Sequence, residues 1–277
     1  MNILSLLNVF VYFCENFITI PMRKITATVI TYNEGENIER CLKSLQGVAD
    51  EIIVVDSFST DNTLEICSRY DCFVTQRRFN GYGAQKQYAV SLSTNSYILS
   101  IDADEYLDDD LRRSIIKLKN DGFAHRIYSL DRLNYYCNVP VKHSGWSPDC
   151  PIRLFDKRYA SWNLRDVHEA VIFPGTLRPQ LIFGLLIHHK CNSAEEHRRK
   201  EDRFASINAK ILINEGRKSN IITPYFKAAA AFLYTYFRRL GCLDGSVGIE
   251  ISRTAAHSAF ATYQIMRRNL KNMSEPQ

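Results

Sequence analysis

The sequence predicts an α/β fold, with a mostly parallel, doubly wound sheet flanked by helices and a helical C-terminal region. Two observations predict this class. Segments rich in β-branched residues alternate along the first half of the chain with segments whose apolar residues recur at helical spacing, as in parallel sheets. Polar clusters also follow three of the expected strands, at residues 31–34, 56–61 and 102–105. In parallel sheets, ligands bind outside these strand ends.

The first elements are clear in the sequence. "ITATVIT" at 25–31 is a strand by its β-branched content. Apolar residues at 38, 41, 42 and 45 predict a helix that Gly47 ends. "EIIVVD" at 51–56 is apolar up to its last residue, as a strand covered on both faces would be. The "STDNT" segment then offers caps for a helix that runs to Cys67.

Later elements follow a different order. A short strand at 72–75, a helix within 81–92 and a strand at 97–101 complete the alternation. Short β-rich runs replace it from 126 to 183. Ser193 and Glu196 form a capping box for a helix that Gly216 ends, and 224–270 is helical with a break at 241–248. We divide the chain into an extension (1–21), a half of alternating strands and helices (22–125), a half of short β-rich runs (126–192) and a helical region (193–277).

Composition excludes several classes of protein. The chain has 277 residues, of which 45% are hydrophobic, so it can bury a sizeable core. Its net charge of +5 is too weak to predict a nucleic-acid partner, but it suits acidic substrates or an anionic membrane surface. The eight cysteines form no CxxC pair, which predicts reduced thiols in the cytoplasm rather than disulfides or a zinc site.

The first twenty residues are apolar and aromatic, but they lack the basic region and cleavage site of a signal peptide. Glu15 and Asn16 also interrupt any membrane span. Met22 directly precedes Arg23, Lys24 and the first strand. We therefore expect residues 1–21 to be an extension outside the site, and a chain that begins at Met22 to fold and act like the full one.

Asp102 and Asp104 follow an apolar strand and lie two residues apart. On a strand end their side chains would share one face, where two carboxylates repel unless a cation lies between them. Mg²⁺ takes few protein carboxylates and completes its shell with water and substrate phosphates. This D-x-D motif therefore predicts a site for a divalent metal and a diphosphate. Asp108 to Asp110 are expected to be solvated, in the first turn of the next helix.

Two other charged residues are candidates for ligand contact. Asp56 ends the second strand too early to cap the next helix, which Thr60 or Asp61 could cap, so we expect it to accept hydrogen bonds from a nucleotide base or sugar. Arg153 in "PIRLF" either pairs with a diphosphate, to which the guanidinium fork is suited, or is a surface charge.

Four segments together resemble the inverting glycosyltransferases of family 2: "VITYNEGENIERCLKSL", "DEIIVVDSFSTDNT", "GYGAQKQYA" and "YILSIDADEYL". They cover 25–107, and "VHE" and "DGSVGIEIS" further on resemble lipopolysaccharide core-type glucosyltransferases of Gram-negative bacteria. The resemblance implies a Rossmann-like GT-A fold, Mg²⁺ or Mn²⁺, and transfer of a hexose such as glucose. It makes 22–125 the nucleotide-sugar-binding half and 126–192 the acceptor and catalytic half. The donor would be a UDP-sugar and the acceptor a surface glycan or a lipid-linked lipopolysaccharide core.

The resemblance also implies roles for residues. In the family, the strand end "TYNE" contacts the nucleotide, the acid after the second strand holds the base, and the lysine of "GAQKQ" lines the donor site. The D-x-D holds ribose and metal. These roles fall on Thr31, Asn33, Glu34, Asp56, Lys86, Asp102 for the donor and Asp104 for the metal.

An inverting transfer needs one carboxylate to deprotonate the acceptor hydroxyl, while the metal stabilises the departing diphosphate. "LRDVHEAV" offers Glu169, which best matches the family position, and Asp166; a salt bridge with Arg165 is the structural alternative. A late histidine completes the metal shell in some GT-A enzymes. His188 is preferred for this role over His189, and a packed or surface histidine is the alternative.

The helical tail combines aromatic and apolar faces with arginines in "PYFKAAAAFLYTYFRRLG" and "YQIMRRNLKN". This pattern suits peripheral binding to the inner face of the cytoplasmic membrane, or a helical pair packed on the catalytic domain or on a dimer partner. Rival functions are a sugar nucleotidyltransferase, which would need a Gly-rich loop after the first strand, and a catalytically silent scaffold. A haloacid-type phosphatase is disfavoured because Glu105 and Tyr106 follow the D-x-D.

Overall fold

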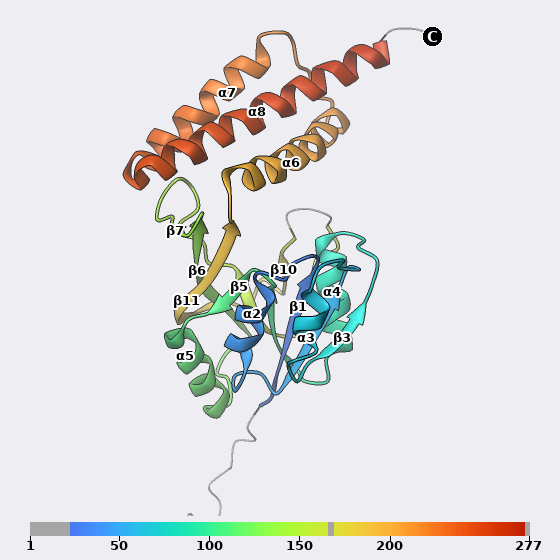
Figure 1. The fold of residues 1–277 in the computed structure, drawn as a ribbon, viewed down its shortest axis with the longest axis vertical. Helices are drawn as coiled ribbons and strands as arrows, with labels where there is room; N and C mark the ends of the chain where they lie inside the picture. The colour runs from blue at the N-terminus through green and yellow to red at the C-terminus, as the bar shows by residue number, and fades with distance from the viewer. Residues whose placement is uncertain (1–22, 166–168, 275–277) are drawn as a thin grey trace, which may run out of the picture.

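The computed structural model of the protein describes residues 23–165 and 169–274, with side chains as far as residue 270 (Figure 1). The expectations for residues 1–21 and for Asp166 lie outside the described residues.

The described residues form one large sheet of nine strands, in the order β3-β2-β1-β4-β8-β6-β11-β5, with β7 paired to β6. Its first four strands are parallel to one another. They and the helices between them are β1 (Ile25–Thr31), α2 (Ile38–Leu45), β2 (Glu51–Asp56), α3 (Thr63–Cys67), β3 (Phe73–Gln76), α4 (Tyr82–Leu92) and β4 (Tyr97–Asp102). The predicted alternation of strand and helix is confirmed, with β3 displaced by one residue.

The second half of the chain extends the same sheet. β8 pairs antiparallel with β4 and β6, and β11 pairs parallel with β6 and antiparallel with β5. The elements are β5 (Glu105–Leu107), α5 (Asp109–Asn120), β6 (Ile127–Tyr136), β7 (Val139–Pro140), β8 (Ile152–Asp156) and β11 (Gln180–Cys191), and β9 (Ser161–Trp162) pairs separately with β10 (Val171–Ile172). The predicted α/β class with a mostly parallel sheet is confirmed.

The core surrounds the central strands. Ile25, Ala27 and Val29 of β1 are fully buried, and so are Leu42 and Leu45 on the inner face of α2. Each fully buried aliphatic side chain of this kind contributes about 1.5–3 kcal/mol. Helices cover this sheet, which explains why its central strands are buried along their length, with the small polar side chains of Thr26, Thr28 and Ser100 buried among apolar ones and the charged side chains at the strand ends.

The C-terminal region consists of helices, as predicted: α6 (Ala194–Asn214), α7 (Thr223–Leu233), the π-helix η1 (Tyr234–Arg238), the 3₁₀-helix η2 (Gly241–Asp244) and α8 (Gly245–Ser274). Figure 1 shows α6 nearest the sheet, α7 outermost, and α8 between these two helices. Ser193 caps α6 by accepting a hydrogen bond from Glu196 N, and Gly216 follows the helix at a φ of +72°. No helix in the described part of the chain combines the length and apolar content that a membrane crossing requires.

Asp244 attaches the helical region to the sheet. Its carboxylate accepts hydrogen bonds from the backbone N–H groups of Lys142 and His143, both at 3.2 Å, and from Ser144 Oγ at 2.6 Å. A Cβ on Gly248 would lie 1.7 Å from the carbonyl oxygen of Gly241, so α8 approaches η2 as closely as only glycine permits. The "DGSVG" segment therefore has a structural role, because it holds the start of α8 against η2 and the loop after β7.

Candidate active site

The carboxyl ends of the parallel strands bring predicted site residues into one row. The register pairs Thr31 of β1 with Asp56 of β2, and Ile30 with Asp102 of β4. Ligands of such sheets bind along this edge. The structure therefore gathers Thr31, Asp56 and Asp102 where the sequence predicted a site.

Asn33 and Asp56 hold the loops at this edge. Asn33 has a φ of +54°, a left-handed conformation that asparagine tolerates. Its N–H donates to Ser59 Oγ and its Oδ1 accepts from Thr60 N, both at 2.8 Å. The buried Asp56 carboxylate accepts hydrogen bonds at 2.9 Å from Ser59 N and Gln76 Nε2. These contacts order the edge of the sheet, and contact of either residue with a nucleotide stays a prediction.

The two aspartates of the D-x-D have different partners. β4 ends at Asp102 and β5 begins at Glu105, with a turn between them. The expectation that strand geometry places both carboxylates on one face was therefore wrong. Asp102 lies 2.9 Å from Lys86 Nζ and 2.8 Å from the Arg153 guanidinium, whereas Asp104 Oδ2 lies 3.4 Å from His188 Nε2.

Charges alternate through the centre of the site. Lys86 Nζ also lies 2.9 Å from Glu169 Oε1, so this lysine joins Glu169 to Asp102. Lys86 is 2% exposed and Arg153 is 3% exposed. Buried cations need such partners, since removing one partner leaves an uncompensated charge. Burial raises the pKa of Asp102, but the charges and hydrogen bonds of Lys86 and Arg153 outweigh it and hold that pKa well below its usual range.

Glu105 is a site residue that the sequence analysis missed. It is fully buried, and its Oε1 lies 2.6 Å from the Arg153 guanidinium and 2.7 Å from that of Arg132. Its Oε2 accepts a hydrogen bond from Asp102 N at 3.0 Å. A signal was present in the sequence: Glu105 shares a strand face with the apolar Leu107, and alternation along a strand places both on the inner side.

Trp162 was also missed. It is buried, and its ring lies under both central cations, 4.8 Å from Lys86 Nζ and 5.8 Å from the Arg153 guanidinium carbon. Cations at these distances from an indole face are stabilised by the ring's quadrupole. The sequence signal is rarity, because the chain has only two tryptophans and this one shortly precedes Glu169.

The structure distinguishes the two histidines. Asn134 Nδ2 donates to the carbonyl of Trp146 and to Asp149, so its Oδ1 acts as the acceptor for His188 Nδ1 at 2.6 Å. This contact places a proton on Nδ1 and directs Nε2 at Asp104. His189 points to the other face of β11, with its ring stacked 5.1 Å from Tyr135 and 5.8 Å from Tyr106.

Asp104 and His188 are the side chains here that could bind a divalent cation. Among residues 23–165 and 169–274, no group of three or more His, Cys, Asp or Glu is arranged to hold a metal ion. Mg²⁺, however, commonly takes one or two carboxylates and completes its shell with water and phosphate. Asp104 Oδ2 and His188 Nε2 face each other as potential metal ligands. Asp102, in contrast, is already paired with the cations Lys86 and Arg153. The residues fit a cation held by Asp104 and His188, with the other ligands supplied by substrate.

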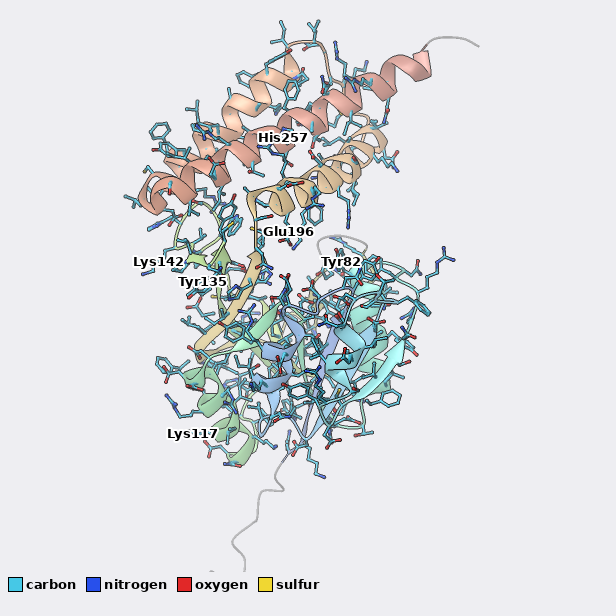
Figure 2. All side chains as sticks on the ribbon, viewed as in Figure 1. Tyr82, Lys117, Tyr135, Lys142, Glu196 and His257 are labelled. Carbon is cyan, nitrogen blue, oxygen red and sulfur yellow. The ribbon has the colours of Figure 1, made fainter. Side chains whose placement is uncertain are left out.

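Negative charge is concentrated around Asp104. Burial, together with the charge of Asp104, raises the pKa of Glu34 to about 7. From α6, Lys200 Nζ pairs with Glu196 at 2.9 Å and donates to the carbonyl of Lys190 at 2.9 Å. Burial lowers the pKa of Lys200, but Glu196, Asp104 and Glu34 together raise it above its usual value. Figure 2 shows Glu196 in the first turn of α6, above the sheet. The helical region therefore contributes the positive charge of Lys200 and the negative charge of Glu196 to this end of the site.

Gly83 fixes the segment that leads to Glu169. Its N–H donates to the carbonyl of Arg165 at 3.2 Å, and an added Cβ would lie 2.0 Å from the carbonyl oxygen of Asn163. We expect Gly83→Ala to displace this segment and to lower kcat on the order of a hundredfold, because a shift of about 1 Å at a reacting group has that effect. Steady-state kinetics measure it.

The matched control is Gly175→Ala, where an added Cβ meets nothing within 4 Å. This variant should keep normal kcat and melting temperature. Normal turnover in Gly83→Ala would show that the 163–165 segment does not position Glu169.

Comparisons with known proteins identify the family of the chain. The family model described as "Glycosyl transferase family 2" matches residues 26–173. A relative named uncharacterized glycosyltransferase RP128, from Rickettsia prowazekii, is 30% identical over 248 residues, which is 86% of this chain and 85% of the relative. LpsC of Rhizobium meliloti, named a lipopolysaccharide core biosynthesis glycosyltransferase, is 27% identical over 249 residues, 88% of this chain and 92% of the relative.

Among solved structures, Staphylococcus aureus TarS 1–349 in complex with UDP-GlcNAc aligns with a TM-score of 0.44 at 13% identity. The alignment covers 92% of this chain and 93% of that one.

Proposed function

Because the chain belongs to glycosyltransferase family 2, we propose that it transfers a hexose such as glucose, with inversion, from a UDP-sugar to a lipopolysaccharide-core or related surface-glycan acceptor. One observation carries the proposal: Lys86 links Glu169 to Asp102 at the carboxyl edge of the sheet. A carboxylate suited to act as a base is thus held beside the edge where the donor would bind. The named role of LpsC supports the acceptor class.

On the donor side, the nucleotide would lie along the edge formed by Thr31, Asn33 and Asp56. Glu34 belongs to the same loop, and its carboxylate accepts a hydrogen bond from Asn37 at 2.8 Å. Mg²⁺ or Mn²⁺ would be held by Asp104 and His188, and would neutralise charge on the leaving diphosphate. Arg153 is buried against Asp102 and Glu105, so we assign it to orienting Asp102 and to the positive potential behind the diphosphate.

On the acceptor side, Glu169 would take the proton from the attacking hydroxyl. The hydroxyl oxygen forms a bond to the anomeric carbon as the bond from that carbon to the diphosphate oxygen breaks, which gives inversion. Lys86 donates a hydrogen bond to Oε1 at 2.9 Å and so orients the carboxylate. Asp166, which lies outside the described residues, remains the alternative base.

Glu169→Gln tests this assignment. Glutamine keeps the shape of the side chain but cannot accept the proton, so kcat should fall about a hundredfold or more. Binding of UDP, measured by calorimetry, should persist. A control is Glu195→Gln, on a side chain that is 81% exposed on α6. Normal activity in Glu169→Gln together with an inactive Asp166→Asn would transfer the role to Asp166.

We also propose that the protein acts in the cytoplasm. The seven cysteines in the described part of the chain are all free, as expected for reduced thiols.

A panel of nucleotide sugars with product analysis separates the rival functions. A transferase releases UDP and forms a glycoside. A nucleotidyltransferase leaves the nucleotide sugar unchanged until pyrophosphate is added, when it forms a nucleoside triphosphate and a sugar 1-phosphate. A silent scaffold forms none of these products.

A further inference from the structure

The outward face of α7 and η1 is apolar. Phe226 is 68% exposed, Leu233 is 53% exposed and Phe237 is 60% exposed. Their spacing, with Ile222 and Ala230, places them along one side of the helix. A helix on the surface of a soluble domain normally exposes its polar side chains to water. On α7, apolar side chains are exposed instead.

The opposite side of α7 packs on the protein. Pro224 and Thr235 are buried, and the ring of Tyr225 lies 5.2 Å from that of Phe260 on α8. Figure 1 shows α8 on one side of α7 and no described element on its other side. The exposed apolar side chains continue beyond η1, with Leu240 just before η2 and Leu243 within it. These exposed apolar side chains follow one another along a single segment, whereas the exposed hydrophobic residues of most protein surfaces are scattered singly.

The same segment is positively charged. From residue 217 to residue 243 the sequence contains Arg217, Lys218, Lys227, Arg238 and Arg239, and it contains no aspartate or glutamate. The next acid, Asp244, is directed at the loop after β7. We name this segment, with its exposed apolar and basic side chains, the α7 surface.

We propose that the α7 surface docks on an anionic phospholipid bilayer. Aromatic and aliphatic side chains flanked by lysine and arginine are the combination that lies in a lipid interface, with apolar groups among the acyl chains and cations at the phosphates. A second copy of the chain fits less well, because a two-fold contact would bring two such basic surfaces together. This proposal goes beyond the proposed function and does not depend on it.

Vesicle binding by the full chain tests the proposal. We expect co-sedimentation with vesicles of phosphatidylcholine and phosphatidylglycerol, less with phosphatidylcholine alone, and weaker binding in high salt. Phe226→Ser with Phe237→Ser should lower the fraction bound at least tenfold, since both aromatic side chains leave the interface. Lys218→Glu with Arg238→Glu should remove the preference for phosphatidylglycerol. The matched control is Phe183→Ser, on a side chain of β11 that is 76% exposed and lies outside the α7 surface.

A second measurement reports on the surface itself. Tryptophan fluorescence of Phe226→Trp should be quenched by brominated lipid, beyond the quenching of the chain's own tryptophans, and Phe183→Trp should add no quenching. Equal vesicle binding by the double serine variant and the native chain, or absence of quenching in Phe226→Trp, would overturn the proposal. So would a stable dimer, measured by light scattering, that Phe226→Ser with Phe237→Ser dissociates.

Discussion

Asp104→Asn should abolish sugar transfer while leaving the fold intact. Asp104 Oδ2 lies 3.4 Å from His188 Nε2, and no lysine or arginine within the described ranges forms an ion pair with this carboxylate. Burial raises its pKa, but His188 holds that pKa below its usual value, so Asp104 is ionised at neutral pH. Asparagine removes the charge that a divalent cation needs. Transfer should fall by at least a thousandfold, on the scale seen when charge stabilisation of a leaving group is lost.

Two measurements accompany the loss of activity. Titration of Mn²⁺ in the presence of UDP should show binding to the native chain and none to Asp104→Asn, while circular dichroism and melting temperature stay unchanged. Asp110→Asn is the control, because this aspartate lies on the surface and pairs with Arg113. Full activity of Asp104→Asn in the presence of a chelator would contradict the metal assignment.

Glu105→Gln should lower the free energy of unfolding by about 3–5 kcal/mol, the usual result of removing one member of a buried ion pair. Glu105 is fully buried between Arg132 and Arg153. Glutamine would leave two guanidinium groups without their shared carboxylate and would direct an N–H₂ group at donors. Denaturation with urea, followed by circular dichroism, measures the change.

The comparison variant is Glu65→Gln. Glu65 pairs with Arg69 at 2.6 Å, but both side chains are more than half exposed. Exposed pairs of this kind contribute at most about 1 kcal/mol. If Glu105→Gln lost no more stability than Glu65→Gln, the Glu105 network would not be what holds β4, β6 and β8 together at the site.

The strands and helices of the first half were predictable because each is specified locally. β-branched runs and helical spacing are properties of a few neighbouring residues, and the helix that begins after Ser193 carries its own cap. The candidate site could be expected at the carboxyl edge because the alternation predicts parallel strands, whose carboxyl ends share one edge of the sheet.

The partners of the acids could not be predicted, because they come from distant parts of the chain. Glu105 meets Arg132 and Arg153, which follow it by 27 and 48 residues. The D-x-D failed as a strand pattern because the backbone turns directly after Asp102. The choice between His188 and His189 depends on Asn134, which lies on a neighbouring strand. An amphipathic pattern likewise does not say which side of α7 meets the protein.

The order of helices above the sheet has a consequence for reach. α6 lies nearest the sheet, α8 lies between α6 and α7, and α7 is outermost. Packed helices stand 8–10 Å apart, so the axes of α6 and α7 are separated by about 16–20 Å. With the α7 surface on a bilayer, the catalytic edge would be held at least that far above the lipid. The distance between the bilayer and the catalytic edge would then select acceptors by length. A glycan whose acceptor hydroxyl extends several sugars from the membrane would reach this edge, and a shorter glycan would not.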